Sequence, residues 1–205
     1  MIETLLSFSL ATVALALSPG PDNIYVLTQS LAHGSKSGIA TTAGLISGCI
    51  VHTALLAFGI SALITASEGL FLAIKIIGAA YLLYLAFKVF RADAAIQISE
   101  GNTQKKSPWN YFKTGVIMNL LNPKVMLFFI AFFPAFLWNP DSNTVYQFFV
   151  LGGVFMGVSF IVFSAIALLA GSISRFIKHH KGVGVLLKWL QIIVFVGIAV
   201  FILIP

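Results

Sequence analysis

The sequence predicts an all-α integral membrane protein: six transmembrane helices form two inverted three-helix repeats, with the first and fourth helices interrupted. Three observations lead to this fold class. Hydrophobic residues make up 59% of the 205 residues and charged residues only 9%, against about 25% charged residues in soluble domains. The apolar runs reach about 20 residues, the length that crosses a bilayer as a helix. Prolines and charged residues interrupt two of these runs near their middle.

Charges in the connections between the apolar runs predict how the helices are oriented. The runs cover residues 3–31, 38–64, 70–90, 111–137, 145–172 and 183–204. Basic residues follow the first, third and fifth runs, whereas the loops after the second and fourth carry only Glu68 and Asp141. Because short basic loops stay in the cytoplasm, both termini are expected on the non-cytoplasmic side. The same placement explains the net charge of +6 without a nucleic-acid partner.

One long polar stretch divides the chain near its midpoint. Three helices on each side of it must enter the membrane in opposite directions, which is the plan of the inverted repeats in many secondary transporters. We therefore expect one membrane domain, made of a first repeat, a cytoplasmic linker and a second repeat, at residues 1–90, 91–110 and 111–205.

Two glycine pairs give this repeat some support. Gly44 and Gly48 form a GxxxG pattern in the second run, and Gly153 and Gly157 form another in the fifth. Small residues at this spacing let two helices approach closely. Close packing inside the fold is the favoured interpretation, and a homodimer interface is the alternative.

The interrupted helices contain prolines where a helix tolerates them least. The prolines in question are Pro19, Pro21 and Pro123. Proline lacks the backbone donor and clashes with the preceding turn, so each helix should break and restart there. Asn122-Pro123, and either Ser18-Pro19 or Gly20-Pro21, suit a capping residue followed by proline at the first helical position.

The breaks predict a binding site at mid-membrane. Backbone groups freed by a break cannot face lipid, so both breaks must be buried or line a cavity. Two new helix N-termini, one from each half of the chain, would then point inward. Their partial positive charge suits a carboxylate.

Two ionisable residues accompany the breaks. Asp22 lies eleven residues before His33, and Lys124 lies eleven residues after Lys113, so each is about 16 Å from the cytoplasmic edge, half of a core about 30 Å thick. Intramembrane charges are unfavourable and usually face a partner or a pathway. An Asp22–Lys124 ion pair is the simplest arrangement, and a purely structural pair is the alternative.

Other side chains limit the chemistry. His52 lies mid-way along the second run, where it suits a proton relay or a hydrogen-bonded core histidine. Cys49 is the single cysteine, so neither a disulfide nor a thiolate metal site is expected. A metal-cation exporter needs several converging ligands, and only Asp22 and His52 qualify as such ligands. No HExxH occurs, and no enzymatic activity or cofactor is expected. A passive channel or a scaffold protein remains an alternative function.

Several stretches resemble the LysE/RhtB family of bacterial amino-acid exporters. They are "SPGPDNIYVLTQSLAHGSKSGIATTAGLISGCIVH", "GAAYLLYLAFKVF" and "FKTGVIMNLLNPKVMLFFIAFFPAF". The likeness covers most of the chain, and its most specific parts are SPGP with the following acid, GAAYL and NPK. The resemblance implies a bacterial inner-membrane exporter of amino acids or related metabolites, driven by the proton-motive force.

The residues and the resemblance together predict a mechanism. The substrate-binding residues are expected to be Ser18, Gly20, Asp22, Asn23, Asn119, Asn122 and Lys124. The substrate ammonium would displace Lys124 from Asp22, and protonation of Asp22, relayed by His52, would release the substrate outward. Asp22 is the only acid deep in a run, so no second acid would remain for a basic side chain. Neutral substrates such as threonine, homoserine or leucine are therefore favoured.

Overall fold

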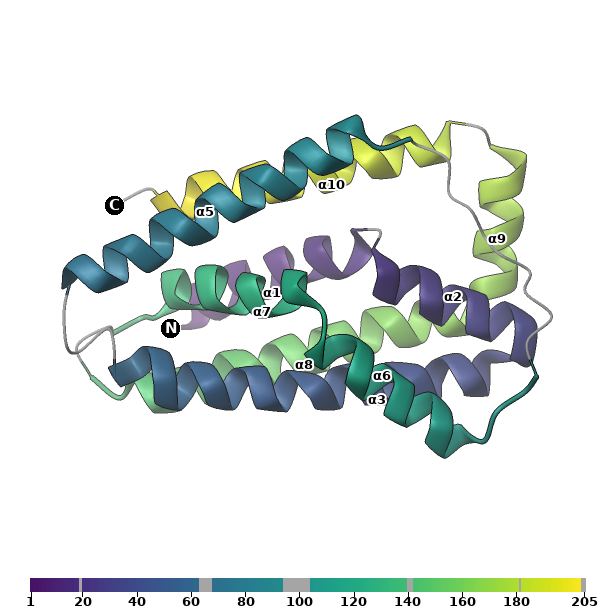
Figure 1. The fold of residues 1–205 in the computed structure, drawn as a ribbon, viewed down its shortest axis with the longest axis horizontal. Coiled ribbons are helices and arrows are strands. Elements are labelled where there is room, and N and C mark those ends of the chain that lie inside the picture. The colour runs from purple at the N-terminus through teal and green to yellow at the C-terminus, as the bar shows by residue number, and fades with distance from the viewer. Residues whose placement is uncertain (19, 63–67, 94–103, 140–141, 181, 204–205) are drawn as a thin grey trace.

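The computed structural model describes residues 1–18, 20–62, 68–93, 104–139, 142–180 and 182–203, and the secondary structure over these residues is helical. Figure 1 shows the elements in chain order. The α-helices are α1 (Ile2–Leu17), α2 (Pro21–His33), α3 (Ser35–Leu55), α5 (Glu68–Arg91), α6 (Pro108–Leu120), α7 (Pro123–Phe132), α8 (Thr144–Leu168), α9 (Ala170–His179) and α10 (Val183–Leu203). A π-helical turn, η1 (Leu56–Ile60), continues α3, and a 3-10 turn, η2 (Phe133–Phe136), continues α7.

Both predicted helix breaks are confirmed. The axes of α1 and α2 differ by 61°. Gly20 is the N-cap of α2 and Pro21 is its first residue, so the restart is the Gly20-Pro21 alternative, while Ser18 caps the end of α1. Pro19 lies outside the described residues. In the second half, α6 ends at Leu120 and α7 begins at Pro123.

The number of spans is supported in part. Among the described residues, four helices are long and apolar enough to cross a membrane, and the bent pair α1 and α2 makes up to five. A sixth span would have to consist of α6 and α7, which are 13 and 10 residues long. Six spans in two inverted repeats thus stay a prediction. The fifth predicted run was too long, because α8 ends at Leu168 and α9 turns across the bundle (Figure 1).

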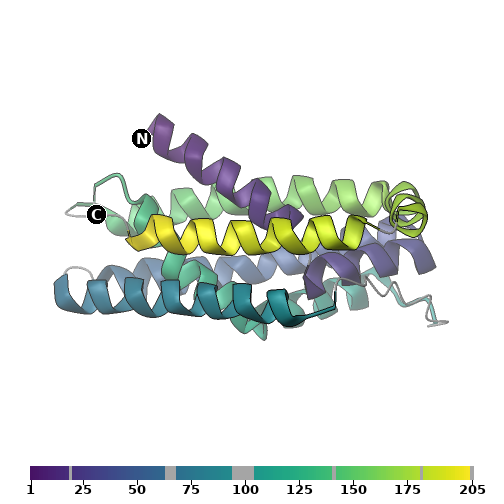
Figure 2. The same cartoon turned by 90° about the horizontal axis from the view of Figure 1, so that it is seen from above.

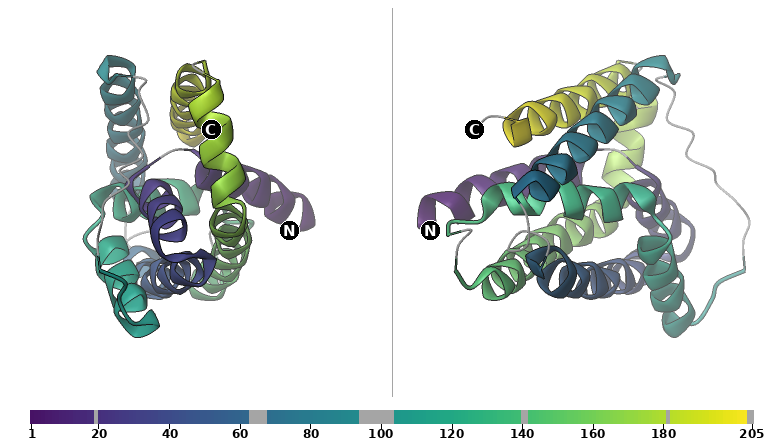
Figure 3. Two further views of the ribbon diagram at one scale, coloured as in Figure 1. Left: turned by 90° about the vertical axis from the view of Figure 1, so that its right-hand side faces the viewer. Right: turned by 60° about the vertical axis from the view of Figure 1, so that its left-hand side comes forward.

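The long helices lie side by side with the termini at one end of the bundle. α5 and α10 pack against each other along one side, and α3 and α8 pack together along the other (Figures 1 and 2). Figure 3 shows that α5 and α10 stand apart from the α3–α8 layer. The ends of α2 and α5, which carry His33 and Arg91 in their last turns, lie with α9 at the end opposite the termini (Figure 1).

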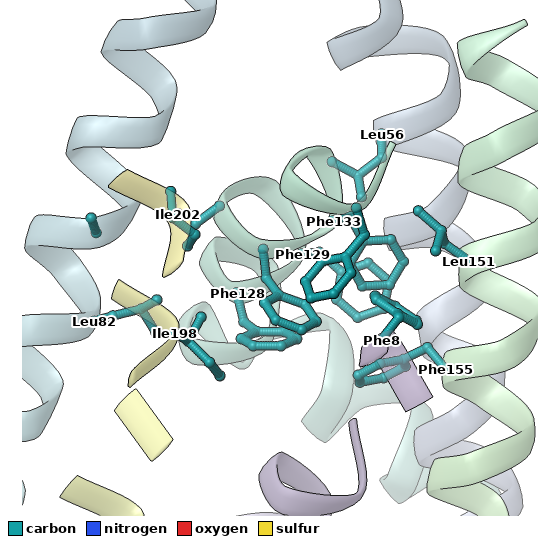
Figure 4. Packing of buried hydrophobic residues seen from close by; sticks show 14 of the residues in the cluster. Phe8, Leu56, Leu82, Phe128, Phe129, Phe133, Leu151, Phe155, Ile198 and Ile202 are labelled. Atoms are coloured by element: carbon teal, nitrogen blue, oxygen red, sulfur yellow. The ribbon is translucent and has the colours of Figure 1, made fainter. Parts of the chain in front are cut away.

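Phenylalanines hold the short helix α7 in the middle of the bundle. Phe8 of α1 contacts Phe132 and Phe133, with ring centroids 5.4 and 5.1 Å apart. Phe129 of α7 stacks on Phe133 at 4.2 Å and meets Phe155 of α8 at 4.9 Å. Figure 4 shows the rings of Phe8, Phe129, Phe133 and Phe155 close together among α1, α7 and α8. The cluster anchors the second break between two long helices, so α7 is positioned by packing although it is short.

The first glycine pair packs inside the fold, as predicted. A Cβ at Gly44 would meet the carbonyl oxygen of Phe112 in α6, and a Cβ at Gly48 would meet the side chain of Asn119. Gly115 of α6 faces the backbone of α3 in return. These contacts bring the α3 and α6 backbones together and place Asn119 against α3.

The prediction for the second pair is wrong. Gly153 and Gly157 are exposed, and among the described residues no atom lies within 4 Å of a Cβ built on either. The close approach of α8 to α3 is made one residue earlier, where Gly152 faces the side chain of Thr53. The two pairs therefore differ in environment and do not support a repeat.

These environments predict opposite effects for the same substitution. Gly44→Val should destabilise the protein by about 1–3 kcal/mol, because its side chain overlaps backbone that cannot move aside easily. Gly157→Val should leave stability nearly unchanged. Thermal unfolding of the purified proteins in detergent measures both, and equal melting temperatures for Gly44→Val and the wild type would contradict the packing described.

Candidate functional site

A cavity of about 60 Å³ lies where the two helix breaks meet. It has room for several water molecules. Four parts of the chain form its walls: the α1–α2 break, α3, the α6–α7 break and α8. Its polar lining consists of Ser18, Asp22, Asn23, Asn119, Asn122 and Ser159, and its apolar lining includes Leu15, Ala16, Leu45, Ile46, Val125, Phe128, Phe155 and Phe163.

One hydrogen bond joins the two breaks. The amide nitrogen Nδ2 of Asn122 donates to Oδ2 of Asp22 over 3.2 Å, although the residues are 100 positions apart. Asp22 is the second residue of α2, where an acidic side chain is stabilised by the helix dipole. The first turns of both α2 and α7 border the cavity, through Asp22 and Val125. Two helix N-termini from different halves therefore meet at one space.

Side chains and caps satisfy the backbone at the first break. Asn23 donates from Nδ2 to the carbonyl oxygen of Ala16 over 2.7 Å, and this carbonyl is among the last four of α1, which have no partner within the helix. The backbone N–H of Ser18 donates to the carbonyls of Ala14 and Leu15. Asn23 therefore holds α1 and α2 together at the break.

Asn119 connects the cavity with α3. Its Nδ2 donates to Sγ of Cys49 over 3.5 Å, and its backbone oxygen lies 3.4 Å from Nε2 of His52. Since a carbonyl only accepts, this contact requires the proton on Nε2 of His52. Oδ1 of Asn119 and Oγ of Ser18 are buried with no hydrogen-bond partner in the part of the chain that the structure describes. Both residues line the cavity, so these oxygens are available to a ligand there.

His52 lies beside a second cavity, of about 100 Å³, whose other lining residues are apolar. The side chain is 3% exposed, and Nδ1 has no partner among the described residues. Leu56 and Ile60 of the π-helical turn line the same space. The structure thus separates His52 from Asp22, and Asn119 is the residue that contacts His52 and borders the first cavity.

The cavity brings together most of the residues singled out in the sequence. Six of the seven predicted substrate-binding residues line it, namely Ser18, Gly20, Asp22, Asn23, Asn119 and Asn122, and so does Pro21. Lys124 is the second residue of α7, but its side chain lies outside the described part of the structure, and the Asp22–Lys124 ion pair stays a prediction. The binding roles of all these residues are likewise predictions.

Sequence reasoning missed the apolar wall of the cavity. Phe155, Ser159 and Phe163 are four residues apart along α8 and line it together. Their spacing places them on one helix face, which is a signal present in the sequence. The fifth run is apolar all round, so nothing in its composition distinguished the face that borders the cavity.

Among the described residues, no group of three or more histidine, cysteine, aspartate or glutamate side chains lies close enough to hold a metal ion. The buried Cys49 is a free thiol. The cavity offers instead carboxylate, amide and hydroxyl groups beside aromatic rings, which is a lining suited to a small polar organic molecule.

Apolar helices long enough to span a membrane, arranged around an internal cavity with polar groups at two helix breaks, define a multi-pass membrane protein. The chain belongs to the LysE type translocator family, which matches residues 13–205. It is similar to the homoserine/homoserine lactone efflux protein of Salmonella typhimurium, with 34% identity over 175 residues that cover 85% of this chain and 84% of the relative. It is also 30% identical to the leucine efflux protein of Klebsiella pneumoniae over 194 residues, covering 95% and 92% of the two chains. No solved structure shows a significant match.

The single cysteine makes the cavity testable by chemical labelling. Cys49 lines the cavity and is 2% exposed, so a small methanethiosulfonate reagent should modify it slowly. Ala16→Phe would fill the space beside it and slow this reaction at least several-fold, whereas Ala80→Phe, on an exposed face of α5, would not. Mass spectrometry of the intact protein follows the modification. Equal rates in Ala16→Phe and the wild type would show that Cys49 is not reached through this cavity.

Proposed function

We propose that this translocator exports neutral amino acids from the bacterial cytoplasm in exchange for protons. The observation that carries the proposal is the cavity at which the N-terminal turns of α2 and α7 meet beside Asp22. The relatives named for homoserine and leucine efflux support the same class of substrate. Each of these substrates carries an ammonium and a carboxylate group, and the cavity offers groups suited to both.

The carboxylate of the substrate would bind at the two helix N-termini. The partial positive charge of the helix N-termini favours an anion there. The free oxygens of Ser18 and Asn119, together with Asp22, suit the ammonium group. Lys124, which begins α7 with Pro123, is proposed to balance Asp22 when no substrate is bound. The substrate ammonium would then replace Lys124 as the cation beside Asp22, so the buried carboxylate is never left without a partner.

The lining favours a neutral side chain. Asp22 is the one acidic residue among the described residues that line the cavity, and the substrate ammonium would occupy it. The remaining walls present leucine, isoleucine, valine and phenylalanine side chains. A lysine or arginine side chain would have to bury its charge against these apolar groups, which is strongly unfavourable.

Proton coupling is proposed to act at Asp22. Protonation would remove the charge that holds the ammonium group and so release the substrate on the outer side. His52 is proposed to relay the proton, and its imidazole contacts the backbone oxygen of Asn119, which borders the cavity. Because an amide group cannot pass a proton on, water in the cavity would have to carry the proton to Asp22. Nδ1 of His52 has no hydrogen-bond partner among the described residues, and His52 lines the second cavity. Nδ1 is therefore proposed to receive the proton from that cavity.

The proposed mechanism includes the predicted topology. Six spans in two inverted repeats of the bacterial inner membrane, with both termini outside the cytoplasm, would allow one half to rock against the other. The packing of α3 on α8 and of α5 on α10 pairs helices at corresponding positions of the two halves. A homodimer also stays a prediction, and the exposed Gly153 and Gly157 of α8 mark where a second helix would approach most closely.

Transport into inside-out vesicles tests the proposed function. Vesicles that contain the protein should accumulate labelled homoserine, threonine or leucine when acidified inside, and an uncoupler should abolish the accumulation. A passive channel would equilibrate the substrate without concentrating it. Failure to accumulate any of these neutral amino acids would contradict the proposal.

Asp22→Asn should lower the rate of this transport by at least tenfold and remove its dependence on the proton gradient. The physical reason is that the amide neither attracts the ammonium group by charge nor exchanges a proton. The matched control is Asp93→Asn, which changes an exposed carboxylate after α5 and should leave transport unchanged. Full, gradient-dependent transport by Asp22→Asn would contradict the proposed role of this carboxylate.

A further inference from the structure

The hydroxyl of Ser159 in the cavity wall lacks the partner that most helical hydroxyls have, as do the buried hydroxyls of Thr42, Thr53 and Ser164 among the described residues. Serine and threonine side chains in a helix commonly donate to the carbonyl four residues earlier. Thr12, Ser30 and Thr41 do so here, with oxygen–oxygen distances of 2.8, 2.7 and 2.9 Å. Ser159 of α8 does not: its Oγ has no hydrogen-bond partner among the described residues, and its side chain is 2% exposed.

The surroundings of Ser159 are apolar. Phe155 and Phe163, one turn before and one turn after it, line the same cavity, and the ring of Phe128 lies 6.1 Å from that of Phe155. Of the three α8 residues that line the cavity, Ser159 is the only polar one. The polar groups at the helix breaks, by contrast, come from the other elements. The cavity therefore combines a polar part at the breaks with an aromatic wall that carries one isolated hydroxyl.

An unpartnered buried hydroxyl is unfavourable unless a ligand completes its hydrogen bond. A site that presents such a group discriminates between ligands, because a ligand without a matching polar atom leaves the group unpaired. The ammonium and carboxylate groups that all amino acids share would bind at the helix breaks. Its side chain would then extend along the remaining wall, where the aromatic rings and Ser159 lie.

We propose that Ser159 selects substrates with a hydroxyl on the side chain. The inference rests on the proposed function and narrows it: the aromatic residues Phe128, Phe155 and Phe163 form a side-chain subsite, and Ser159 hydrogen-bonds to the hydroxyl of a neutral hydroxy-amino acid. An aliphatic amino acid of the same shape enters the subsite but leaves Ser159 unpaired. The translocator therefore favours the hydroxylated member of an isosteric pair.

Two isosteric pairs isolate this hydrogen bond from size and charge. Threonine and valine differ by one hydroxyl in place of a methyl group, and so do homoserine and norvaline. The wild-type protein in inside-out vesicles should transport the hydroxylated member about tenfold more efficiently, as expected for one buried hydrogen bond whose loss leaves a group unpaired. Ser159→Ala should bring the ratio close to one, mainly by slowing the hydroxylated substrates.

Ser164→Ala is the matched control. Ser164 lies on the same helix, and its hydroxyl is also buried without a partner among the described residues, but it does not line the cavity. This variant should keep the wild-type ratio. If Ser164→Ala changes the ratio as much as Ser159→Ala does, or if Ser159→Ala keeps the wild-type ratio, the assignment of Ser159 is overturned.

A binding measurement gives a second readout that does not depend on transport. Substrate in the cavity should protect Cys49 from a thiol reagent, since Cys49 lines the same space. Protection by threonine should need about tenfold less ligand than protection by valine, and Ser159→Ala should abolish this difference. Transport of both members at equal rates by the wild type would refute the selectivity alone, whereas no transport of any amino acid would refute the proposed function as well.

Discussion

The structure depends on the requirement that every backbone group freed by a helix break finds a partner inside the protein. In hydrocarbon, an exposed N–H or C=O costs several kcal/mol. At the first break, the side chain of Asn23 donates to the carbonyl of Ala16, and the N–H of Ser18 donates to carbonyls in the last turn of α1. At the second, the carbonyl of Asn122 accepts from Val125 and Met126. These local bonds allow two broken helices to exist in an apolar bundle, and they leave the first turns of α2 and α7 facing one cavity.

Packing then fixes where the breaks lie. A ten-residue helix such as α7 is too short to be stable by itself. Phe132 ties it to α1, Phe128 to α8, and Phe129 to the η2 turn. On the other side, Gly44 and Gly115 let α3 and α6 touch backbone to backbone, which brings Asn119 to Cys49 and His52. Apolar contacts with α1, α3 and α8 therefore fix the positions of the helix breaks that carry the polar groups of the cavity.

The sequence predicted those features whose cause is local. Proline at positions 21 and 123 disrupts a helix whatever surrounds it, so the breaks, the two N-termini and the polar residues beside them could be placed. Features that depend on which way a helix faces could not be predicted from the sequence. Gly153 and Gly157 match Gly44 and Gly48 in spacing, yet α8 turns Gly152 toward α3 instead. Ser159 was missed for the same reason, because a uniformly apolar helix does not show which face meets the cavity. The π-helical turn at Leu56–Ile60 has no proline or polar residue to mark it.

The hydrogen bond between Asn122 and Asp22 has a consequence for the proposed exchange cycle. It links residues of the two halves directly at the cavity, so a ligand that replaces Asn122 as the partner of Oδ2 of Asp22 would remove a contact that holds the halves together. In a protein whose halves rock against each other, occupancy of the site and the relative position of the halves would then be coupled by the same carboxylate. A pore needs no such coupling, because its ligands pass without changing contacts between the walls. A carboxylate placed at the junction of two broken helices, and shared between a cross-half hydrogen bond and a ligand, is therefore better suited to a carrier than to a channel.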